Sequence, residues 1–504
     1  MSDPAASETR QWDLHPETEY RFELDPGTTV AIKLLRGQAE IYGCELAEGK
    51  SYLFGEECKA AVFTWRGASI EMSALFEHVI GRPSVEYTSE ETPMAVYANL
   101  HIALEQMRVR ALANIRGSPI PEDEGDPDAT SEPPRVLILG PENSGKTSLC
   151  KMLVNYASRV AQGWAPVVAN LDPAEGAFAL PGAISAAAIP AAIPTCTPAA
   201  TLGLSASSAP MAMAANALVP LVYWYGHPDA KRNPRLLERL IRNLGMGVSD
   251  REDAARNNVK DSASAYASGF IVDTPSSFAS STTGFNEHRQ RLIKAAVEAF
   301  RINVILVLGH EKLNVEMQRT YGSKLTVVKI PKSGGVVELD AAYRERVHKY
   351  QMHTYFYGHV LHPPPGVSNA LLGGEAAADL VLSPSSTVIG FGDLSIYRIG
   401  AESMAPTSAL SIGAVRLISE MQPVQVDPSA PGSGLLNALL AVLAPLNPDE
   451  NERYDEELLD LTVSGFIAVT SVDVQNKQMT VLCPNQGSVV GRTALMGSFE
   501  WQEQ

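Results

Sequence analysis

Residues 135–153 read RVLILGPENSGKTSLCKML, and this stretch decides the fold of the central part of the chain. RVLILG predicts a buried strand, and Gly140–Thr147 fits the phosphate-binding pattern G-x-x-x-x-G-K-[ST]. Apolar residues then recur at helical spacing from Leu149 to Val160. A strand, a glycine-rich loop and a helix in this order predict a P-loop, against the alternative of an ordinary glycine-rich turn.

The chemistry of this loop predicts a bound nucleoside triphosphate, ATP with Mg²⁺. The glycines let backbone N–H groups point at phosphate, and the following helix offers its N-terminus to the anion. Lys146 would reach the β- and γ-phosphates, and the Thr147 hydroxyl would ligate Mg²⁺.

Strands and helices alternate beyond the loop. Apolar runs at 166–172, 269–274, 302–309 and 325–331 predict four further strands with helices between them. Such alternation builds a parallel sheet with helices on both faces. The predicted fold class is therefore α/β, with a central P-loop NTPase domain and a doubly wound, mostly parallel sheet.

Two aspartates end these strands. Asp172 closes PVVANLD and Asp273 closes the strand in GFIVDT, and strand ends in doubly wound sheets face the ligand crevice. Asp172 is a candidate base for an attacking hydroxyl or an organiser of Mg²⁺, and Asp273 fits the position that holds Mg²⁺. For each, the alternative is an aspartate that caps a turn or helix.

The central domain is predicted to lie between two β-rich domains. Short β-branched and aromatic runs predict a small N-terminal sandwich or barrel, taken as a β-sandwich domain over 1–105, and an amphipathic helix follows from Leu100 to Ile115. The kinase-like domain spans 106–358 with an acidic, proline-rich linker at 117–134, and a C-terminal β-rich domain spans 359–504. Part of 402–437 is rich in Ser, Pro and Ala and is expected to be poorly ordered.

Two segments leave alternatives open. Residues 176–228 contain no Asp, Glu, Lys or Arg, which predicts a substrate groove or partner surface, or else buried alanine-rich loops and short helices. Prolines interrupt this segment, so no membrane-spanning helix is expected. Arg344, Arg346, His348 and Lys349 form either a basic lid over the phosphates or a solvated helix face.

The composition narrows the function classes. A net charge of −17 argues against a free-standing nucleic-acid binder, because a polyanion is repelled, but it allows a subunit of a larger nucleic-acid machine. Five scattered cysteines without a CxxC pair argue against a disulfide framework and a zinc ribbon. They favour a reducing compartment, cytoplasm or nucleus, and the N-terminus has no apolar signal segment.

These motifs, taken in order, resemble one family. GPENSGKTSLCKML, NLDPAEGAFALPGAIS, FIVDTP, IPKSGGVVELD and YFYG are similar to the polynucleotide 5′-hydroxyl-kinase family. In particular, they resemble its cleavage-and-polyadenylation branch, whose fungal member is a subunit of cleavage factor IA. The resemblance implies that Glu19 and Lys59 of the N-terminal domain help to hold the nucleotide. It implies further contacts from the loop residues Asn143, Ser144, Gly145, Lys146, Thr147 and Ser148.

The chain departs from the active members of this family at two turns. Those members place Thr-x-Gly-Trp after the fourth-strand region, and the Trp clamps the RNA end by stacking. Here TPSS (274–277) has no Gly-Trp, and Phe278 is out of register. PAEG (173–176) replaces a Gly-Gln-Gly-like turn after Asp172, and the lid has fewer arginines. We therefore predict ATP binding with little or no kinase activity.

The resemblance implies an ATP-binding subunit of the nuclear pre-mRNA 3′-end cleavage and polyadenylation machinery. It would be needed for cleavage before polyadenylation, with ATP mainly structural. Expected partners are the cleavage factor IA scaffold subunit that binds the RNA polymerase II C-terminal domain, other processing subunits, and RNA through the complex. The alternative is an active polyribonucleotide 5′-hydroxyl kinase with Asp172 as base and Arg344 or Arg346 as lid charge. A regulatory NTPase switch is least favoured, because no water-positioning residue is recognisable.

Overall fold

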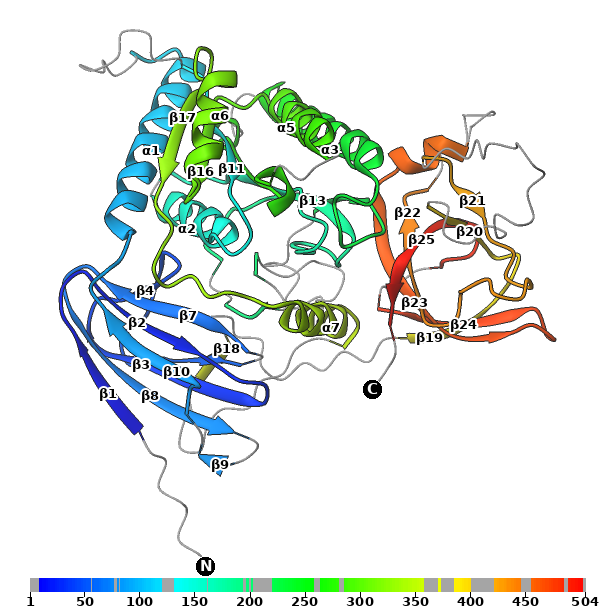
Figure 1. Cartoon of the computed structure of the whole chain (residues 1–504), viewed down its shortest axis with the longest axis horizontal. Helices are drawn as coiled ribbons and strands as arrows, with labels where there is room; N and C mark the ends of the chain where they lie inside the picture. The colour runs from blue at the N-terminus through cyan, green and yellow to red at the C-terminus, as the bar shows by residue number, and fades with distance from the viewer. Residues whose placement is uncertain are drawn as a thin grey trace, which may run out of the picture.

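The chain forms a central α/β domain with a β-domain on either side (Figure 1). This architecture confirms the predicted fold class. The computed structural model describes residues 9–55, 57–76, 79–80, 82–119, 131–160, 162–193, 196–198, 201–202, 220–257, 263–280, 285–357, 370–372, 385–399, 421–445, 455–484 and 488–501.

The N-terminal domain is a sandwich of two sheets with an apolar core between them. One sheet has the order β1 (Thr9–Leu14), β8 (Ala68–Phe76), β3 (Thr28–Gly37), β6 (Ser51–Phe54) and β18 (Ala370–Leu372), with β9 (Val79–Ile80) paired to β8. The other has the order β10 (Val85–Ser89), β2 (Thr18–Glu23), β7 (Lys59–Thr64), β4 (Glu40–Ile41) and β5 (Cys44–Glu45). Strand β18 comes from beyond residue 358, so the chain returns to this sheet after the central domain.

The central sheet contains the five predicted strands as parallel neighbours. Its order is β14 (Leu221–Trp224), β13 (Ala183–Ala188), β12 (Val167–Asn170), β15 (Phe270–Asp273), β11 (Arg135–Leu139), β16 (Val304–Leu308) and β17 (Thr326–Ile330). Helices α1 (Met94–Arg116) and α2 (Lys146–Arg159) pack apolar side chains on one face. On the other face lie α3 (Pro234–Asn257) and α5 (Asn286–Ala299). Further helices are α4 (Ala263–Ala267), α6 (Glu311–Tyr321) and α7 (Ala341–Tyr357).

The uncharged segment 176–228 contributes two strands to this sheet, and not only loops and short helices. β13 pairs antiparallel with both β12 and β14, and residues 183–187 are buried. Small alanine side chains fit here because α3 packs closely over β13 and β14. The expectation of a buried segment is therefore correct for these residues, while 203–219 lie outside the described residues.

The C-terminal domain is a seven-stranded sheet docked against the central sheet. Trp224 on β14 packs against Phe466 and Phe499, with ring centroids 5.3 and 6.0 Å away. The strand order is β19 (Ser385–Gly390), β24 (Gln478–Cys483), β23 (Val463–Asp473), β22 (Ala438–Leu443), β25 (Arg492–Glu500), β20 (Leu394–Arg398) and β21 (Val424–Gln425).

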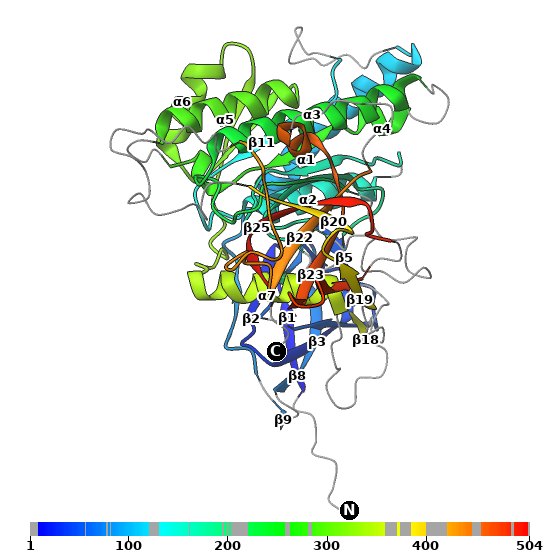
Figure 2. The same ribbon diagram turned by 90° about the vertical axis from the view of Figure 1, so that its right-hand side faces the viewer.

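Helix α7 lies where the three domains meet, as Figures 1 and 2 both show. Arg346 on this helix bonds with Glu57 of the N-terminal domain, and the Tyr355 hydroxyl accepts a hydrogen bond from the Phe466 N–H of the C-terminal domain.

The domain boundary predicted at residue 105 falls within α1. Residues 120–130 of the predicted linker and 402–420 of the Ser/Pro/Ala-rich stretch lie outside the described residues. Among the helices that the structure describes, none is both long and apolar enough to cross a bilayer.

Candidate functional site

The P-loop joins β11 to α2 in a conformation that a bulkier sequence could not adopt. Asn143 and Gly145 have φ angles of 51° and 87°, in the left-handed region that glycine and asparagine tolerate best. A Cβ on Gly140 would lie 2.6 Å from the Ser144 Oγ. The Ser144 hydroxyl donates to the Pro141 carbonyl over 2.8 Å, which closes the loop on itself.

Lys146, Thr147 and Asp273 meet at the start of α2. The Thr147 hydroxyl donates to Asp273 Oδ2 over 2.6 Å, and the Lys146 ammonium donates to the Pro141 carbonyl over 3.1 Å. Burial raises the pKa of Asp273, while the Lys146 charge and the Thr147 hydrogen bond oppose that rise. A hydroxyl and a carboxylate side by side are the hard oxygen donors that Mg²⁺ prefers.

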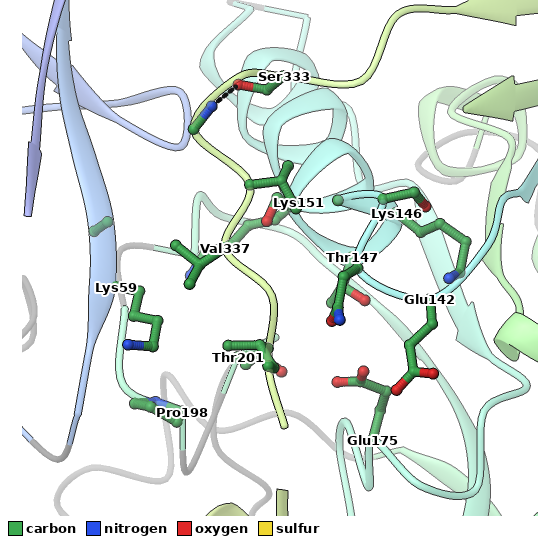
Figure 3. A pocket seen from close by; sticks show the side chains of 18 of the residues that line it. Lys59, Glu142, Lys146, Thr147, Lys151, Glu175, Pro198, Thr201, Ser333 and Val337 are labelled. Atoms are coloured by element: carbon green, nitrogen blue, oxygen red, sulfur yellow. Dashed lines mark hydrogen bonds between the residues drawn. The ribbon is translucent and has the colours of Figure 1, made fainter. Parts of the chain in front are cut away.

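A cavity of about 620 Å³ opens in front of the loop, within the usual range for small-molecule sites. In Figure 3, Lys59 projects from the N-terminal domain on the side opposite Lys146 and Thr147. Nine of the eleven residues predicted for the site line this cavity: Glu19, Lys59, Asn143, Ser144, Gly145, Lys146, Thr147, Ser148 and Asp172. Asp273 contacts the site by accepting the hydrogen bond of Thr147. The sequence motifs therefore converge on one place.

The N-terminal wall carries Glu19 and Lys59, each held by a neighbour. Glu19 accepts hydrogen bonds from Arg21 (2.7 Å) and from Thr92 (2.5 Å). Lys59 pairs with Glu23 over 2.8 Å, and its ammonium lies 5.4 Å from the centre of the Tyr343 ring. These orienting neighbours carry no sequence motif of their own, so sequence reasoning missed them.

Two carboxyl groups, Asp172 and Glu175, line the cavity opposite the P-loop. Asp172 accepts the backbone N–H of Ala174 over 3.0 Å, which forms a turn. Burial raises the pKa of Asp172 to about 6, although the Lys146 charge opposes it. Burial, and then the Asp172 charge, raise the pKa of Glu175 to about 7. Burial thus moves the pKa values of both carboxyl groups toward neutrality, the direction that suits a general base.

Only one arginine of the predicted lid faces the P-loop. Arg344 donates to Asn143 Oδ1 over 2.7 Å and pairs with Glu142 over 2.9 Å. Its Nε is buried and has no hydrogen-bond partner among the described residues. A buried donor of this kind fits an anionic ligand.

Arg346 points away from the P-loop, contrary to the prediction that it could serve as a lid charge. Its guanidinium bonds with both carboxylate oxygens of Glu57, over 2.7 and 2.8 Å, and Tyr350 donates to the same carboxylate over 3.0 Å. His348 lies 2.8 Å from the Ala174 carbonyl. Lys349 pairs with Glu345 on the exposed face. Arg346 is drawn away because the buried Glu57 carboxylate needs a cationic partner.

The turn after β15 holds no aromatic side chain toward the cavity. Residues 276–278 form a short 3₁₀ helix, and Ser276 and Ser277 line the cavity. Phe278 is 0% exposed and packs into the core, with its carbonyl bonded to Arg289 over 3.1 Å. Phe278 therefore cannot stack on a base from this position.

The fold and the loop define a P-loop nucleotide-binding protein. Comparison with known families narrows this class. Residues 13–111 match "N-terminal beta-sandwich domain of polyadenylation factor", residues 140–358 match "mRNA cleavage and polyadenylation factor CLP1 P-loop", and residues 382–503 match "Pre-mRNA cleavage complex II protein Clp1". The chain belongs to the mRNA cleavage and polyadenylation factor CLP1 family.

Relatives from distant organisms cover nearly the whole chain. The chain is 67% identical over 504 residues to the mRNA cleavage and polyadenylation factor CLP1 of Laccaria bicolor, with full coverage of both chains. It is 32% identical to the CLP1 homolog of Arabidopsis thaliana, covering 99% of this chain and 96% of the relative.

Two solved structures share the fold. "Structure of wild-type Clp1p-Pcf11p (454 -563) complex" matches with a TM-score of 0.73 at 23% identity, covering 99% of each chain. A second, described as an extended interface between Pcf11p and Clp1p with the structural basis for ATP loss in a point mutant, matches at 0.74 and 23% identity. It covers 99% of this chain and 100% of that one.

Proposed function

We propose that this chain is the ATP-binding subunit of the nuclear pre-mRNA 3′-end cleavage and polyadenylation machinery, in which ATP is mainly structural. One observation carries the proposal: the walls of the P-loop cavity come from the N-terminal sandwich, the P-loop and helix α7. A ligand in this cavity would fix the relative positions of all three. A ligand at a hundredfold excess over its Kd adds about 2.7 kcal/mol to the folded state.

The residues present fit ATP and Mg²⁺. The tight loop, the α2 N-terminus and the unpartnered Nε of Arg344 suit phosphate, and Thr147 with Asp273 suits the metal. We propose that Asn143 to Ser148 and Gly140 hold the phosphates, while Glu19 and Lys59 hold the nucleoside. Bound Mg²⁺ would neutralise phosphate charge.

Two contacts favour a structural role for ATP over phosphoryl transfer. Ser277 stands where active kinases of this family carry a clamping Trp, and the neighbouring Phe278 is buried, so neither residue offers an RNA end a stacking partner. Arg346 is bound to Glu57 and not available to the phosphates. The site thus supports holding a nucleotide better than moving its γ-phosphate.

The experiment is a measurement of the nucleotide carried by the purified full-length chain. We expect ATP, recovered unhydrolysed by chromatography after acid extraction, and none in Lys146→Ala. Recovery of ADP from wild-type protein, or steady hydrolysis of added ATP, would refute the structural role.

The partner we propose is the cleavage factor IA scaffold subunit that binds the RNA polymerase II C-terminal domain. The related Clp1p was solved in complex with Pcf11p. Other 3′-end processing subunits, and RNA through the complex, would follow in a nuclear assembly. Affinity purification of the tagged chain from nuclear extract tests this, and a preparation without 3′-processing subunits would contradict it.

A second candidate function is a polyribonucleotide 5′-hydroxyl kinase, with Asp172 as base. The raised pKa of Asp172, caused first by burial, favours it as a proton acceptor. The test is transfer of labelled γ-phosphate to 5′-hydroxyl RNA. Transfer by wild type above the Lys146→Ala background would establish this function over the structural one.

A further inference from the structure

Lys151 is a buried lysine in the wall of the nucleotide cavity. It lies on α2, one helical turn beyond Ser148, and is only 4% exposed although it lines the cavity. In the view of Figure 3 it lies between Lys146 and Lys59. The position connects the phosphate end of the cavity with the N-terminal wall.

Within the described part of the chain, this lysine has no anionic partner. Its ammonium lies 5.2 Å from the centre of the Tyr42 ring, and among the described residues no carboxylate or carbonyl accepts a hydrogen bond from it. By contrast, Lys59 is paired with Glu23, and Lys146 donates to a loop carbonyl.

The carboxylate of Glu40 is already engaged by other partners. Glu40 also lines the cavity, but its oxygens accept hydrogen bonds from Tyr156 (2.6 Å) and Arg159 (2.9 Å). A lysine taken out of water without an anion destabilises the fold, and a cation over one tyrosine ring recovers only part of that loss. A charge held in this state at a ligand cavity indicates that the ligand supplies the anion.

The helix geometry selects which part of the ligand this is. Ser148 and Lys151 are three residues apart and therefore share one face of α2. Ser148 and Tyr42 line the same cavity, and the Tyr42 ring faces the Lys151 ammonium. With the terminal phosphates at Lys146 and Thr147 and the nucleoside at Glu19 and Lys59, the group that passes Ser148 and Lys151 is the α-phosphate.

We infer that Lys151 binds the α-phosphate of the nucleotide, so that the site distinguishes nucleotides from nucleosides through a second lysine beyond the P-loop lysine. The inference rests on the proposed function, because it needs a nucleotide in this orientation. Through the Tyr42 ring that its ammonium faces, Lys151 also connects the nucleotide to the N-terminal domain.

The test compares Lys151→Met, which keeps the length and removes the charge, with Lys151→Arg, which keeps the charge. Full-length protein is freed of nucleotide by dialysis against EDTA, and the Kd of ATP, ADP, AMP and adenosine is measured by calorimetry or competition. Lys312→Met, at an exposed position on α6, is the matched control. Thermal unfolding of each nucleotide-free variant is measured alongside.

We expect Lys151→Met to weaken ATP, ADP and AMP by a common factor of about 10 to 100, the loss of one hydrogen bond to a charged group. Adenosine binding should not change, and Lys151→Arg should stay within about threefold of wild type. Nucleotide-free Lys151→Met should unfold at the wild-type temperature or above, because it no longer buries an unpaired charge.

Three results would overturn the inference. Unchanged ATP affinity in Lys151→Met would remove the contact altogether. An equal loss for adenosine would assign Lys151 to the nucleoside, and an unchanged AMP affinity would assign it to an outer phosphate. If wild type binds no nucleotide, the proposed function fails; if wild type binds and Lys151→Met binds equally, only this inference fails.

Discussion

The bond between Glu57 and Arg346 should control how fast the nucleotide leaves. Helix α7 forms one wall of the cavity through Tyr343, Arg344 and His348, so we expect movement of this helix to speed release. The Glu57 side chain is 4% exposed and accepts two hydrogen bonds from Arg346 and one from Tyr350. This contact is the main polar connection that we find between α7 and the N-terminal domain among the described residues.

The expected change in release rate follows from how exposed the Glu57 and Arg346 side chains are. A hydrogen bond to a buried charged group contributes about 1.5–3 kcal/mol. The Arg346 side chain is 42% exposed, and solvent screening lowers its share. Glu57→Gln keeps the shape and removes the charge, so we expect a loss of about 1–2 kcal/mol, which raises the release rate about 5- to 30-fold.

The assay is stopped-flow release of a fluorescent ATP analogue from the full-length protein. Glu345→Gln is the matched control, because its pair with Lys349 is exposed and lies on the same helix. Glu57→Gln alone and with Arg346→Gln should give similar rates, because both remove the same ion pair without leaving a buried carboxylate unpaired. A release rate for Glu57→Gln within twofold of wild type would refute the reasoning.

The same bond predicts a pH dependence. Burial opposes ionisation of Glu57, but the hydrogen bonds from Arg346 and Tyr350 outweigh it and hold the pKa of Glu57 below its ordinary 4.5. The stabilisation is therefore fully present above pH 4.5 and is lost as the pH falls below that value. Release by wild type should accelerate below pH 4.5, and release by Glu57→Gln should lack this acceleration.

Three further predictions concern the loop and the cavity. Gly140→Ala should abolish ATP retention while leaving the circular dichroism spectrum unchanged, because the new methyl group would lie 2.6 Å from the Ser144 hydroxyl; ATP recovered at the wild-type level would contradict this. Burial raises the pKa of Glu175 from 4.5 to about 7, so the nucleotide-free protein should lose thermal stability as the pH rises from 4.5 to about 7, and Glu175→Gln should lose less; equal slopes would contradict this. Phe278→Ala should cost about 3–5 kcal/mol in denaturant unfolding, as a core residue does, with no change in phosphoryl transfer to RNA; a specific loss of transfer with full stability would indicate a substrate contact.

Local sequence was enough for the nucleotide-binding loop. The strand, the glycine-rich turn and the helix around Gly140–Thr147 are consecutive in the chain, so each element's signal lies within its own few residues. The same holds for Asp273, which ends a short apolar strand and does bond with Thr147. The parallel sheet could be predicted because alternating strands and helices allow few other topologies.

Other features had no local signal. The Ala-rich residues 183–188 show neither β-branched enrichment nor alternation, and they form a strand because β12 and β14 supply its hydrogen bonds on both sides. Phe278 could equally have faced the cavity, and only packing against the core decides otherwise.

The sequence by itself therefore determined that this protein has a P-loop, a parallel sheet around it and β-rich flanks, because these follow from periodicity and from motifs within single segments. Only the tertiary structure decided that Arg346 pairs with Glu57 and that Lys151 lines the cavity without an anionic partner among the residues described. The physical reason is that charges choose their partners by distance and burial in three dimensions, and Glu57 and Arg346 are 289 positions apart in the chain.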